Sequence, residues 1–269
     1  RPIAFQNNDR PGIMTAGAVR AYLNRWGVAP GKAVTVFANN DAAHRTALDL
    51  IDAGVHVTAV LDSRTDAQAQ GDYRLIRGAE PADQPLSGRR LIRGAQVCNS
   101  TGRTGLDAIT YRTTSGQEKL ATDCLAMSGG WNPTVHMTCH MNGRPTWDET
   151  IASFVPTAGS IPGMTVAGAA LGVFSVQGCL ASGADAARTV LKELGRSVAD
   201  VEVPVADDAA YAIAPLWAVA GKGRAWLDFQ NDVTVKDVKQ AATENFRSVE
   251  HMKRYTTQGM ATDQGKSSN

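Results

Sequence analysis

The segment TVFANNDAAHRTALDLIDAGVHVTAVLD (residues 35–62) has the layout of a site for the phosphates and ribose of a dinucleotide. Such a site places three glycines in the turn between a strand and a helix, and an acidic residue at the end of the next strand. The acidic residue is present as Asp62, but the glycine positions hold Ala38, Asn40 and Ala43. The side chain of Asn40 stands where a pyrophosphate approaches the backbone most closely. We therefore expect the scaffold of a nucleotide site without its nucleotide.

A strand, a helix and a second strand must surround this turn, and the sequence predicts all three. Apolar residues run from Ala33 to Ala38 and from Val55 to Leu61, as in the buried strands of a parallel sheet. Between them, the helix is predicted by apolar residues on one face: Ala42, Ala43, Ala47, Leu50 and Ile51. The unit indicates an α/β fold.

A second candidate site lies in PGMTVAGAALGVFS (residues 162–175), which we expect to be a short buried strand and a turn. A long amphipathic helix should follow, from Val176 to its stop at Gly195. Small residues allow a ligand to come close, and the helix N-terminus would face a phosphate or a ribose. The residues assigned to this site are Gly130, Gly168, Ala169, Val173 and Ser175. The alternative is a buried strand and turn that bind nothing.

Two further groups of residues have weaker patterns. His136 and His140, with Cys139 between them, would share one helix face, but a metal site needs more ligands than this and we expect a structural role. A basic group near the end of the chain is either a solvated face or the rim of a subunit interface that holds a flavin phosphate or another anion. Its members are His251, Lys253, Arg254, Tyr255 and Lys266.

Composition limits the class of protein. The formal net charge of +1 gives no reason to expect nucleic acid or an anionic membrane as a partner. The four cysteines contain no CxxC pair, which suits a reducing compartment such as the cytoplasm. The uncharged stretch from Glu149 to Asp185 is interrupted by Pro156, Pro162 and six glycines, so we expect no membrane span.

The first half of the chain predicts further elements. Residues 13–26 should form a helix that stops at Gly27, and the polar residues 63–88 should be mainly irregular. A three-stranded meander should follow, with TSGQ as its second turn; its strands are expected near 90–99, 106–113 and 118–127.

The second half is predicted to begin with the loop-rich residues 132–160. The acidic run VADVEVPVADDAA is the best boundary in composition, and a strand and two or three short helices should follow it. Asp232 or Thr234 would cap the first of these helices.

The order of these pieces, with GGWNP after the meander, resembles the flavoprotein disulfide reductases that have two dinucleotide domains. That resemblance implies a dinucleotide-type domain inserted into a second FAD/NAD-type domain, whose glycine-rich first half we expect upstream of Arg1. It divides the chain into the end of the first domain with a connecting helix, the inserted domain, the return segment, and a linker with a small helical domain. The corresponding residues are 1–27, 28–125, 126–198 and 199–269.

The closing stretch WLDFQNDVTVKDVKQAATENFRSVEHMKRYTTQGMATDQGKSSN resembles the alpha subunits of heterotetrameric sarcosine oxidase, as do RPIAFQNNDRPGIMTAGAVRAYLNRWGV and GGWNPTVH. The resemblance implies an oxidoreductase acting on the CH–NH group of sarcosine with oxygen, which yields glycine and hydrogen peroxide and passes a one-carbon unit to tetrahydrofolate. It implies beta, gamma and delta subunits as partners, FAD in the beta subunit, FMN at the alpha–beta interface and NAD in this chain. No catalytic residue is expected in this piece.

Two departures from related patterns refine the expectation. The flavoproteins have Gly-Asp where this chain has Gly168 and Ala169, so the carboxylate that meets the ribityl chain of FAD is absent, which agrees with NAD. Related proline and hydroxyproline dehydrogenase subunits carry a 2Fe–2S domain near the end, and the positions of its cysteines hold Asp228, Gln230, Asp263 and Ser268 here. Four-cysteine ligation of a cluster is therefore not expected. An alpha-like subunit of such an amino-acid dehydrogenase and a ligand-free scaffold are the alternatives.

Overall fold

The computed structural model describes residues 1–65, 90–199, 201–209 and 211–265. Two compact units are present, one formed by Arg1–Gly130 with Ala214–Asn269 and the other by Trp131–Ile213. None of the helices in the described ranges is long and apolar enough to cross a membrane. Nearly all of the expected irregular segment 63–88 lies outside the described residues.

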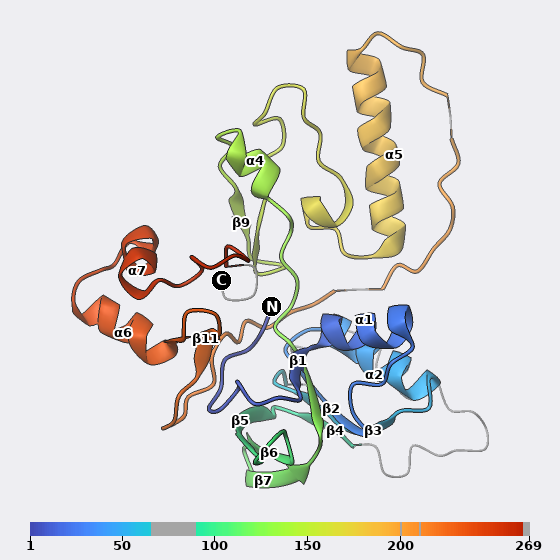
Figure 1. Ribbon diagram of the computed structural model, residues 1–269. Helices are drawn as coiled ribbons and strands as arrows, with labels where there is room; N and C mark the ends of the chain where they lie inside the picture. The colour runs from blue at the N-terminus through green and yellow to red at the C-terminus, as the bar shows by residue number, and fades with distance from the viewer. Residues whose placement is uncertain (66–89, 200, 210, 266–269) are drawn as a thin grey trace. The chain divides into compact units, whose positions relative to one another are not determined.

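A five-stranded parallel sheet forms the centre of the first unit, in the order β1-β8-β2-β3-β4 (Figure 1). Its strands are β1 (Ile13–Thr15), β2 (Ala33–Ala38), β3 (His56–Asp62), β4 (Arg90–Arg93) and β8 (Cys124–Ser128). The expected strand–helix–strand unit is confirmed as β2, α2 (Ala42–Asp52) and β3, with the second strand starting one residue later than predicted. Continuous apolar runs in β2 and β8 fit strands that are covered on both faces.

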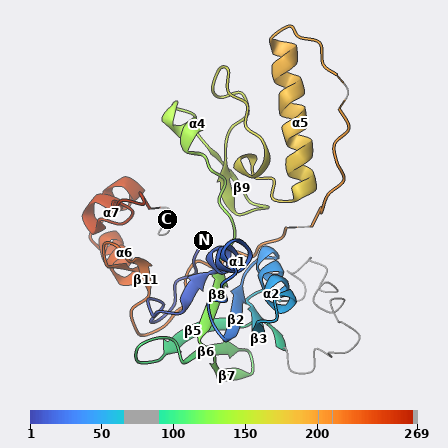
Figure 2. The same ribbon diagram turned by 45° about the vertical axis from the view of Figure 1, so that its right-hand side comes forward.

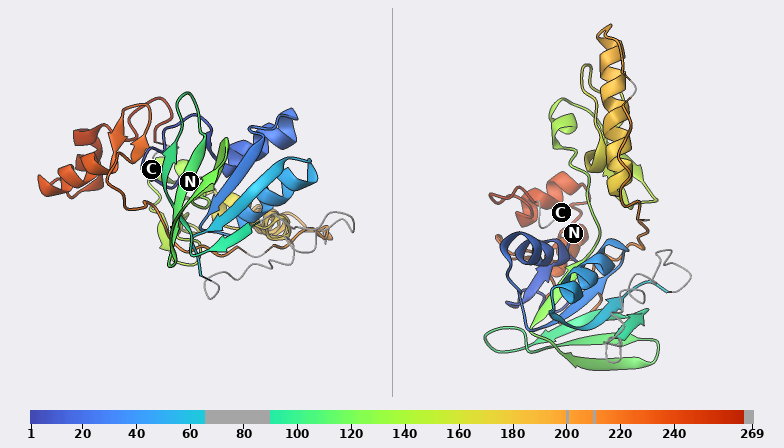
Figure 3. Two further views of the ribbon diagram at one scale, coloured as in Figure 1. Left: turned by 90° about the horizontal axis from the view of Figure 1, so that it is seen from below. Right: turned by 90° about the vertical axis from the view of Figure 1, so that its right-hand side faces the viewer.

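Helices α1 (Ala16–Trp26) and α2 cover one face of this sheet (Figures 2 and 3). A second, antiparallel sheet covers the other face; its strands are β5 (Gln96–Thr101), β6 (Ala108–Thr113) and β7 (Gly116–Ala121). On the helical side, alternate residues of β2 pack against alanines and leucines of α2. These buried residues are Val34, Val36, Ala38, Ala43, Ala47 and Leu50.

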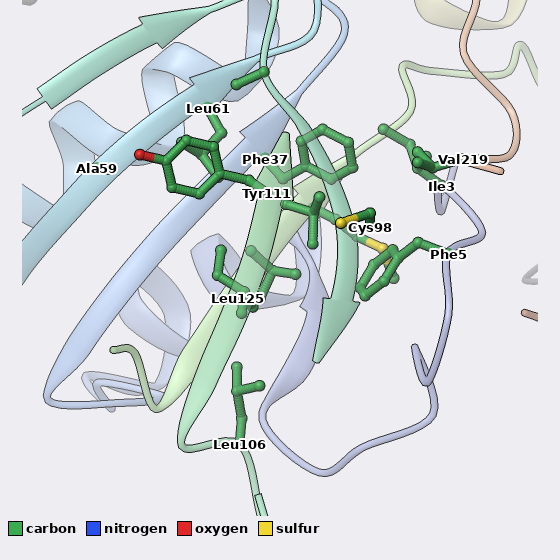
Figure 4. Packing of buried hydrophobic residues seen from close by; sticks show 14 residues of the cluster. Ile3, Phe5, Phe37, Ala59, Leu61, Cys98, Leu106, Tyr111, Leu125 and Val219 are labelled. Carbon is green, nitrogen blue, oxygen red and sulfur yellow. The ribbon is translucent and has the colours of Figure 1, made fainter. Parts of the chain in front are cut away.

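The other face of the parallel sheet packs on the antiparallel sheet through large side chains (Figure 4). Phe37, Leu61 and Leu125 are completely buried there. The N-terminal segment closes the same cluster, since the rings of Phe5 and Phe37 meet edge to face with centroids 6.4 Å apart. The core of the first unit therefore depends on apolar side chains and not on the residues of the turn after β2.

The predicted bounds of the meander are wrong at both ends. Residues 90–99 form two strands in different sheets, because Gly94 takes a left-handed φ of 64° and turns the chain from β4 into β5. Residues 118–127 are likewise divided between β7 and β8. Between these two strands, the carboxylate of Asp123 accepts the N–H groups of Lys32 and Ala33 at 2.9 and 2.8 Å. The TSGQ turn is confirmed between β6 and β7.

The first predicted helix begins later than expected. Residues 13–15 are the strand β1, which pairs with residues 125–127 of β8 in parallel. A three-residue strand has no periodicity of its own, so only its pairing partner reveals it. The end of the helix is confirmed at Gly27, which has a φ of 64° and donates its N–H to Leu23 O at 3.1 Å.

The second unit is rich in loops, as expected. It contains a short helix, a two-stranded hairpin, a 3₁₀ turn and a long helix: α4 (His136–His140), β9 (Thr146–Asp148), β10 (Ser153–Val155), η1 (Gly168–Leu171) and α5 (Val176–Glu193). The predicted long helix is confirmed as α5. The predicted buried strand GMTVAGA is wrong, because residues 163–167 pair with no strand within the described chain. Gly163 and Gly168 hold left-handed φ values of 74° and 61°, which end extended structure on both sides.

The end of the chain returns to the first unit as a short hairpin and two helices: β11 (Trp226–Asp228), β12 (Val233–Thr234), α6 (Val235–Thr243) and α7 (Val249–Thr256). The predicted strand and short helices are confirmed. Of the two candidate caps, Thr234 is the N-cap of α6 and forms a capping box with Asp237. Thr234 donates its backbone N–H to Asp237 Oδ2 at 2.8 Å.

The cap gives a test of the closing fold. Thr234→Ala should destabilise α6 by about 1 kcal/mol, because the capping hydroxyl is lost. Faster hydrogen exchange of the amides in residues 235–243 of the full-length protein measures this effect. Thr243→Ala is the matched control, since the same substitution at the exposed end of α6 removes only a bond to Lys239 O. Equal exchange in the two variants would contradict the assigned cap.

Candidate functional site

The edge of the parallel sheet at the carboxyl ends of its strands is where an α/β fold binds nucleotides. In this chain a buried asparagine spans that edge. Asn40 Nδ2 donates to Ser128 O at 3.1 Å and to Ser128 Oγ at 3.0 Å, so it joins the end of β2 to the end of β8. The same nitrogen donates to Asn39 Oδ1 at 2.9 Å. Asn40 therefore fills the close-approach position of the turn with an internal contact.

Arg64 is the largest fully buried side chain of the described chain, and it lies at the same edge. Its guanidinium forms a two-pronged pair with Asp62, from Nε to Oδ1 at 3.0 Å and from Nη2 to Oδ2 at 2.8 Å. Its third nitrogen, Nη1, lies 2.7 Å from Asp41 Oδ1. Asp41 is the residue before α2, and Asp62 ends β3. Arg64 therefore connects the position where a phosphate would be held with the position where a ribose would be held.

Asp62 has a third partner in His44, whose Nε2 lies 2.8 Å from Asp62 Oδ2. Burial opposes ionisation of Asp62, but the hydrogen bonds and charges of His44 and Arg64 outweigh it and lower the pKa of this carboxyl. The pKa of Arg64 is raised by Asp62 and Asp41 although its burial acts in the opposite direction. The pair is therefore ionised at neutral pH.

The remaining fingerprint positions are also buried. Ala38 and Ala43 pack in the core between the sheet and its helices, and Asp62 is 0% exposed. Sequence reasoning identified these positions but missed Arg64, because an arginine just after a strand resembles an ordinary solvated residue. The available signal was the acidic pair Asp41 and Asp62 on either side of the helix, which would require a buried cation.

The second candidate site lies within the second unit and begins with Gly168. Its N–H donates to Ser182 Oγ of α5 at 2.7 Å, and its φ of 61° is left-handed. A Cβ at this position would meet Cys179 Sγ at 3.5 Å. Ala169 follows on the exposed side of η1, and Val173 N–H donates to Gly168 O at 3.2 Å. These contacts hold a small-residue turn against the first half of α5.

The N-terminus of α5 has partners within its own unit. Ser175 is the N-cap and accepts the N–H of Gly178 at 3.1 Å. The chain after α5 returns along the helix (Figure 2), and Gln177 N–H donates to Asp207 O at 3.0 Å. Ser175 Oγ also contacts Asp208 Oδ1 at 2.6 Å. An acidic side chain at this end of the helix favours a hydroxyl group over a phosphate as its neighbour.

Gly130 belongs to the first unit, whereas the four other residues assigned to the second site belong to the second unit. It has a φ of 93° and is buried. The preceding Gly129 runs beside the N-terminal segment and donates its N–H to Arg1 O at 2.7 Å.

The structure does not build a site around either the histidine pair or the described residues of the basic group. His136 and His140 lie on the exposed helix α4, and no group of three or more potential metal ligands gathers within the described residues. In the basic group, Tyr255 stacks on Phe246 with ring centroids 4.4 Å apart. Lys266 lies outside the described residues.

Asp228, the first of the positions compared with cluster cysteines, is a buried carboxylate with several donors around it. It accepts the N–H groups of Gln230, Asn231 and Gly259 at 2.9, 3.2 and 2.8 Å. Asn231 Nδ2 donates to its second oxygen at 3.2 Å. Asp228 thus joins the loop after β11 to the loop after α7.

Gln230 and Asp263, the other two described positions compared with cluster cysteines, also accept hydrogen bonds from loop residues. Gln230 Oε1 accepts the hydroxyl of Thr262 at 3.0 Å, and Asp263 Oδ1 accepts the N–H of Gly265 at 3.2 Å. Ser268 lies outside the described residues. The described side chains at these positions therefore serve as hydrogen-bond acceptors.

Comparison with solved structures defines the class of fold. L-proline dehydrogenase from P. horikoshii matches 98% of this chain and 48% of its own, with a TM-score of 0.66 and 17% identity. Thioredoxin reductase from T. acidophilum matches 72% of this chain and 62% of its own, with a TM-score of 0.54 and 16% identity. The protein has an α/β fold with a parallel sheet similar to that of the FAD- and NAD-dependent oxidoreductases.

Sequence comparison defines the family. The sarcosine oxidase subunit alpha of Rhizobium meliloti (strain 1021) is 44% identical over the whole of this chain, and that of Corynebacterium sp. (strain P-1) is 36% identical. The family model for the sarcosine oxidase A3 domain matches residues 222–269. The chain belongs to the family of sarcosine oxidase alpha subunits, as the resemblance predicted. It spans 26% and 28% of the length of these two relatives.

The contacts of Asp228 predict how the closing domain responds to acid. Burial raises the pKa of Asp228, but the hydrogen bonds from the amides of Gly259, Asn231 and Gln230 lower it by more than burial raises it. The pKa in the folded protein therefore lies below the ordinary value of an aspartate. The carboxylate therefore stabilises the fold above the unfolded pKa of about 4, and this contribution is lost as the pH falls through the folded pKa. Hydrogen exchange of residues 257–265 in the full-length protein, measured between pH 6 and pH 3, should show the loss.

Asp228→Asn should remove that pH dependence and destabilise the two loops by about 1–3 kcal/mol at neutral pH, because an amide cannot accept all the donors. Asp232→Asn, an exposed change in the same loop, is the matched control and should leave both properties unchanged. If Asp228→Asn still lost protection of these loops at low pH as the wild type does, the pH dependence would belong to a group other than Asp228.

Proposed function

We propose that this chain is the central part of a sarcosine oxidase alpha subunit whose enzyme oxidatively demethylates sarcosine to glycine. Oxygen accepts the electrons and becomes hydrogen peroxide, and the one-carbon unit passes to tetrahydrofolate. The observation that carries this proposal is 44% identity over the full chain to a sarcosine oxidase subunit alpha. The role of this part is to bind NAD and to assemble with the beta, gamma and delta subunits.

The proposed division of labour leaves no catalytic residue in this chain. Sarcosine is oxidised at FAD in the beta subunit, FMN lies at the alpha–beta interface, and tetrahydrofolate binds another domain. The proposed domain arrangement is a dinucleotide-type domain (residues 28–125) inserted between residues 1–27 and the return segment 126–198. Residues 199–269 supply a linker and a helical domain without a cluster.

NAD is assigned to Gly168, Ala169, Val173 and Ser175, together with Gly130. The left-handed Gly168 and the exposed Ala169 offer a small surface, which fits a closely bound nucleotide. No carboxylate follows Gly168, so the contact that favours FAD is missing. Asp208 beside Ser175 fits a ribose hydroxyl, whereas the amides of Gln177 and Gly178 are already used within the chain.

An amino-acid dehydrogenase subunit is the second candidate, and the similarity of fold to L-proline dehydrogenase favours it. The identity in that comparison is only 17%, and the four positions compared with cluster cysteines hold no thiol. A scaffold without any ligand is the third candidate. The complete complex distinguishes the three: sarcosine-dependent hydrogen peroxide formation supports the first, proline-dependent dye reduction the second, and absence of released NAD the third.

A pair of substitutions tests the position of the nucleotide. Gly168→Leu in the intact subunit should reduce bound NAD at least tenfold, because a bulky side chain replaces the small surface. Asn40→Leu should leave the amount of bound NAD unchanged. In the unsubstituted protein the Asn40 side chain binds Ser128 and already occupies that turn, so we expect no NAD there to be displaced. NAD released by acid is measured per folded subunit, so that any loss of stability in the variants does not affect the ratio.

Gly195→Leu is the control for backbone strain. Gly195 has a φ of 65°, close to the 61° of Gly168, but a Cβ there meets nothing within 4 Å. It should retain NAD, so that loss in Gly168→Leu reflects the ligand and not the left-handed backbone. Release of NAD by Asn40→Leu but not by Gly168→Leu would move the nucleotide to the first unit.

The closing domain should contain neither iron nor acid-labile sulfide. Asp228 and Gln230 form hydrogen bonds between two loops and Asp263 accepts an N–H within its own loop, and carboxylate and amide oxygens do not replace four thiolates at a 2Fe–2S cluster. Metal analysis and visible absorption of the full-length subunit, purified without oxygen, provide the measurement. Stoichiometric iron and sulfide would overturn this expectation and favour the dehydrogenase candidate.

A further inference from the structure

The carboxyl edge of β2 and β3 has the chemistry of a site for a cation. Two carboxylates, Asp41 and Asp62, face one guanidinium from different elements, at 2.7 and 2.8 Å. The side chains of Asp62 and Arg64 are both 0% exposed. A dinucleotide would bring a negatively charged pyrophosphate to this place, where Asp41 would repel it.

The loop that carries Arg64 is bound to the sheet on both sides. Ser63 N–H donates to Ala38 O of β2 at 2.8 Å, and Gly94 N–H donates to Arg64 O at 3.0 Å. Arg64 N–H donates to Asp62 Oδ1 at 3.0 Å, so backbone and side chain bind the same carboxylate. The guanidinium is therefore held in one orientation by the fold, as a bound ligand would be.

We propose that the space between Asp41 and Asp62 is a guanidinium site that the chain fills with its own Arg64, so that an internal cation replaces an external ligand. The site joins the residue before α2 to the end of β3 and to residues 63 and 64 that follow it. Loss of Arg64 takes the guanidinium from the buried Asp62 and from Asp41, and leaves Asp62 with the His44 ring at 2.8 Å. Removing one charge of a buried ion pair destabilises a fold more than replacing the whole pair by uncharged groups. The space that the Arg64 side chain vacates then takes a small guanidinium compound and excludes NAD.

The experiment removes the side chain and returns the guanidinium from solution. In the full-length protein, Arg64→Ala should increase hydrogen exchange of residues 56–62 by about a hundredfold or more. Ethylguanidinium at millimolar concentration should restore protection with a saturable dependence, whereas ethylammonium should restore less, because it lacks the planar fork of donors. Urea and NAD should restore none.

Arg45→Ala, on the neighbouring helix α2, is the matched control. Arg45 pairs with Asp49 at 3.1 Å, but its side chain is 55% exposed, so its loss should change exchange little and ethylguanidinium should have no effect. Unchanged exchange in Arg64→Ala would overturn the proposal. Equal rescue by urea or ethylammonium, or rescue by NAD, would also overturn it.

If Arg64→Ala does not fold, a second pair of variants tests whether Arg64 acts by neutralising Asp62. Arg64→Met takes the guanidinium from Asp62 and leaves it His44 at 2.8 Å, whereas Arg64→Met combined with Asp62→Asn removes both charges of the Arg64–Asp62 pair. The double variant should be better protected and better expressed in folded form than Arg64→Met alone. A double variant that is no better than the single one would show that Arg64 does not act by neutralising Asp62.

Discussion

A carboxylate completely removed from water at the end of β3 is the constraint on which the first candidate site depends. Such a group is tolerated only when its charge is paired and its oxygens accept hydrogen bonds. Asp62 meets both conditions through Arg64, two residues later, and through His44 on α2. Immediately after β3 the chain stays at this edge of the sheet, because Ser63 N–H donates to Ala38 O at 2.8 Å and the Arg64 side chain pairs with Asp62. The position of residues 63 and 64 is therefore tied to this ion pair.

The closing domain obeys the same rule with different donors. Asp228 is 3% exposed, and within the described part of the chain its oxygens are bound by three backbone amides and the side chain of Asn231 and not by an arginine or a lysine. Because these amides belong to two loops, the carboxylate acts as a cross-link between them. Asp62 stands where a dinucleotide site has its ribose-binding acid, and Asp228 stands where related subunits have a cluster cysteine, but both carboxylates form contacts within the chain. A matching position in the sequence is therefore a poor guide to ligand binding in this chain.

Local patterns in the sequence predicted the elements that carry their own periodicity, and they did so well. The strand from Ala33, the helix α2 and the helix α5 all have apolar residues at the right spacing. Membership of a sheet was not predictable in this way, because β7 and β8 are consecutive in sequence but pair with different neighbours. The composition contained the distinction, since GQEKLA is mostly polar and exposed whereas CLAMS is almost completely buried, as a strand covered on both faces must be.

The candidate sites were predictable in part, for a related reason. The missing glycines predict from sequence alone that the turn after β2 is unsuited to a pyrophosphate, but the burial of Arg64 depends on Asp41 and Asp62, which meet only in the folded chain. The segment 163–169 was misread as a strand because its residues are small and apolar. Its left-handed glycines are the positions that decide its course, and a glycine has the same letter in either conformation.

The retention of a nucleotide-type scaffold without its fingerprint has a physical explanation in the separation of core and turn. The parallel sheet is held between two helices and an antiparallel sheet by residues such as Val36, Phe37 and Leu61, all within the strands. None of these contacts requires glycine in the turn after β2. Residues other than glycine in the turn are therefore compatible with the packing that defines the fold, and Asn40 and Arg64 stabilise the polar edge of the sheet. In such a scaffold the turn can change at little cost to the fold, provided that the edge of the sheet has its own hydrogen bonds and ion pairs.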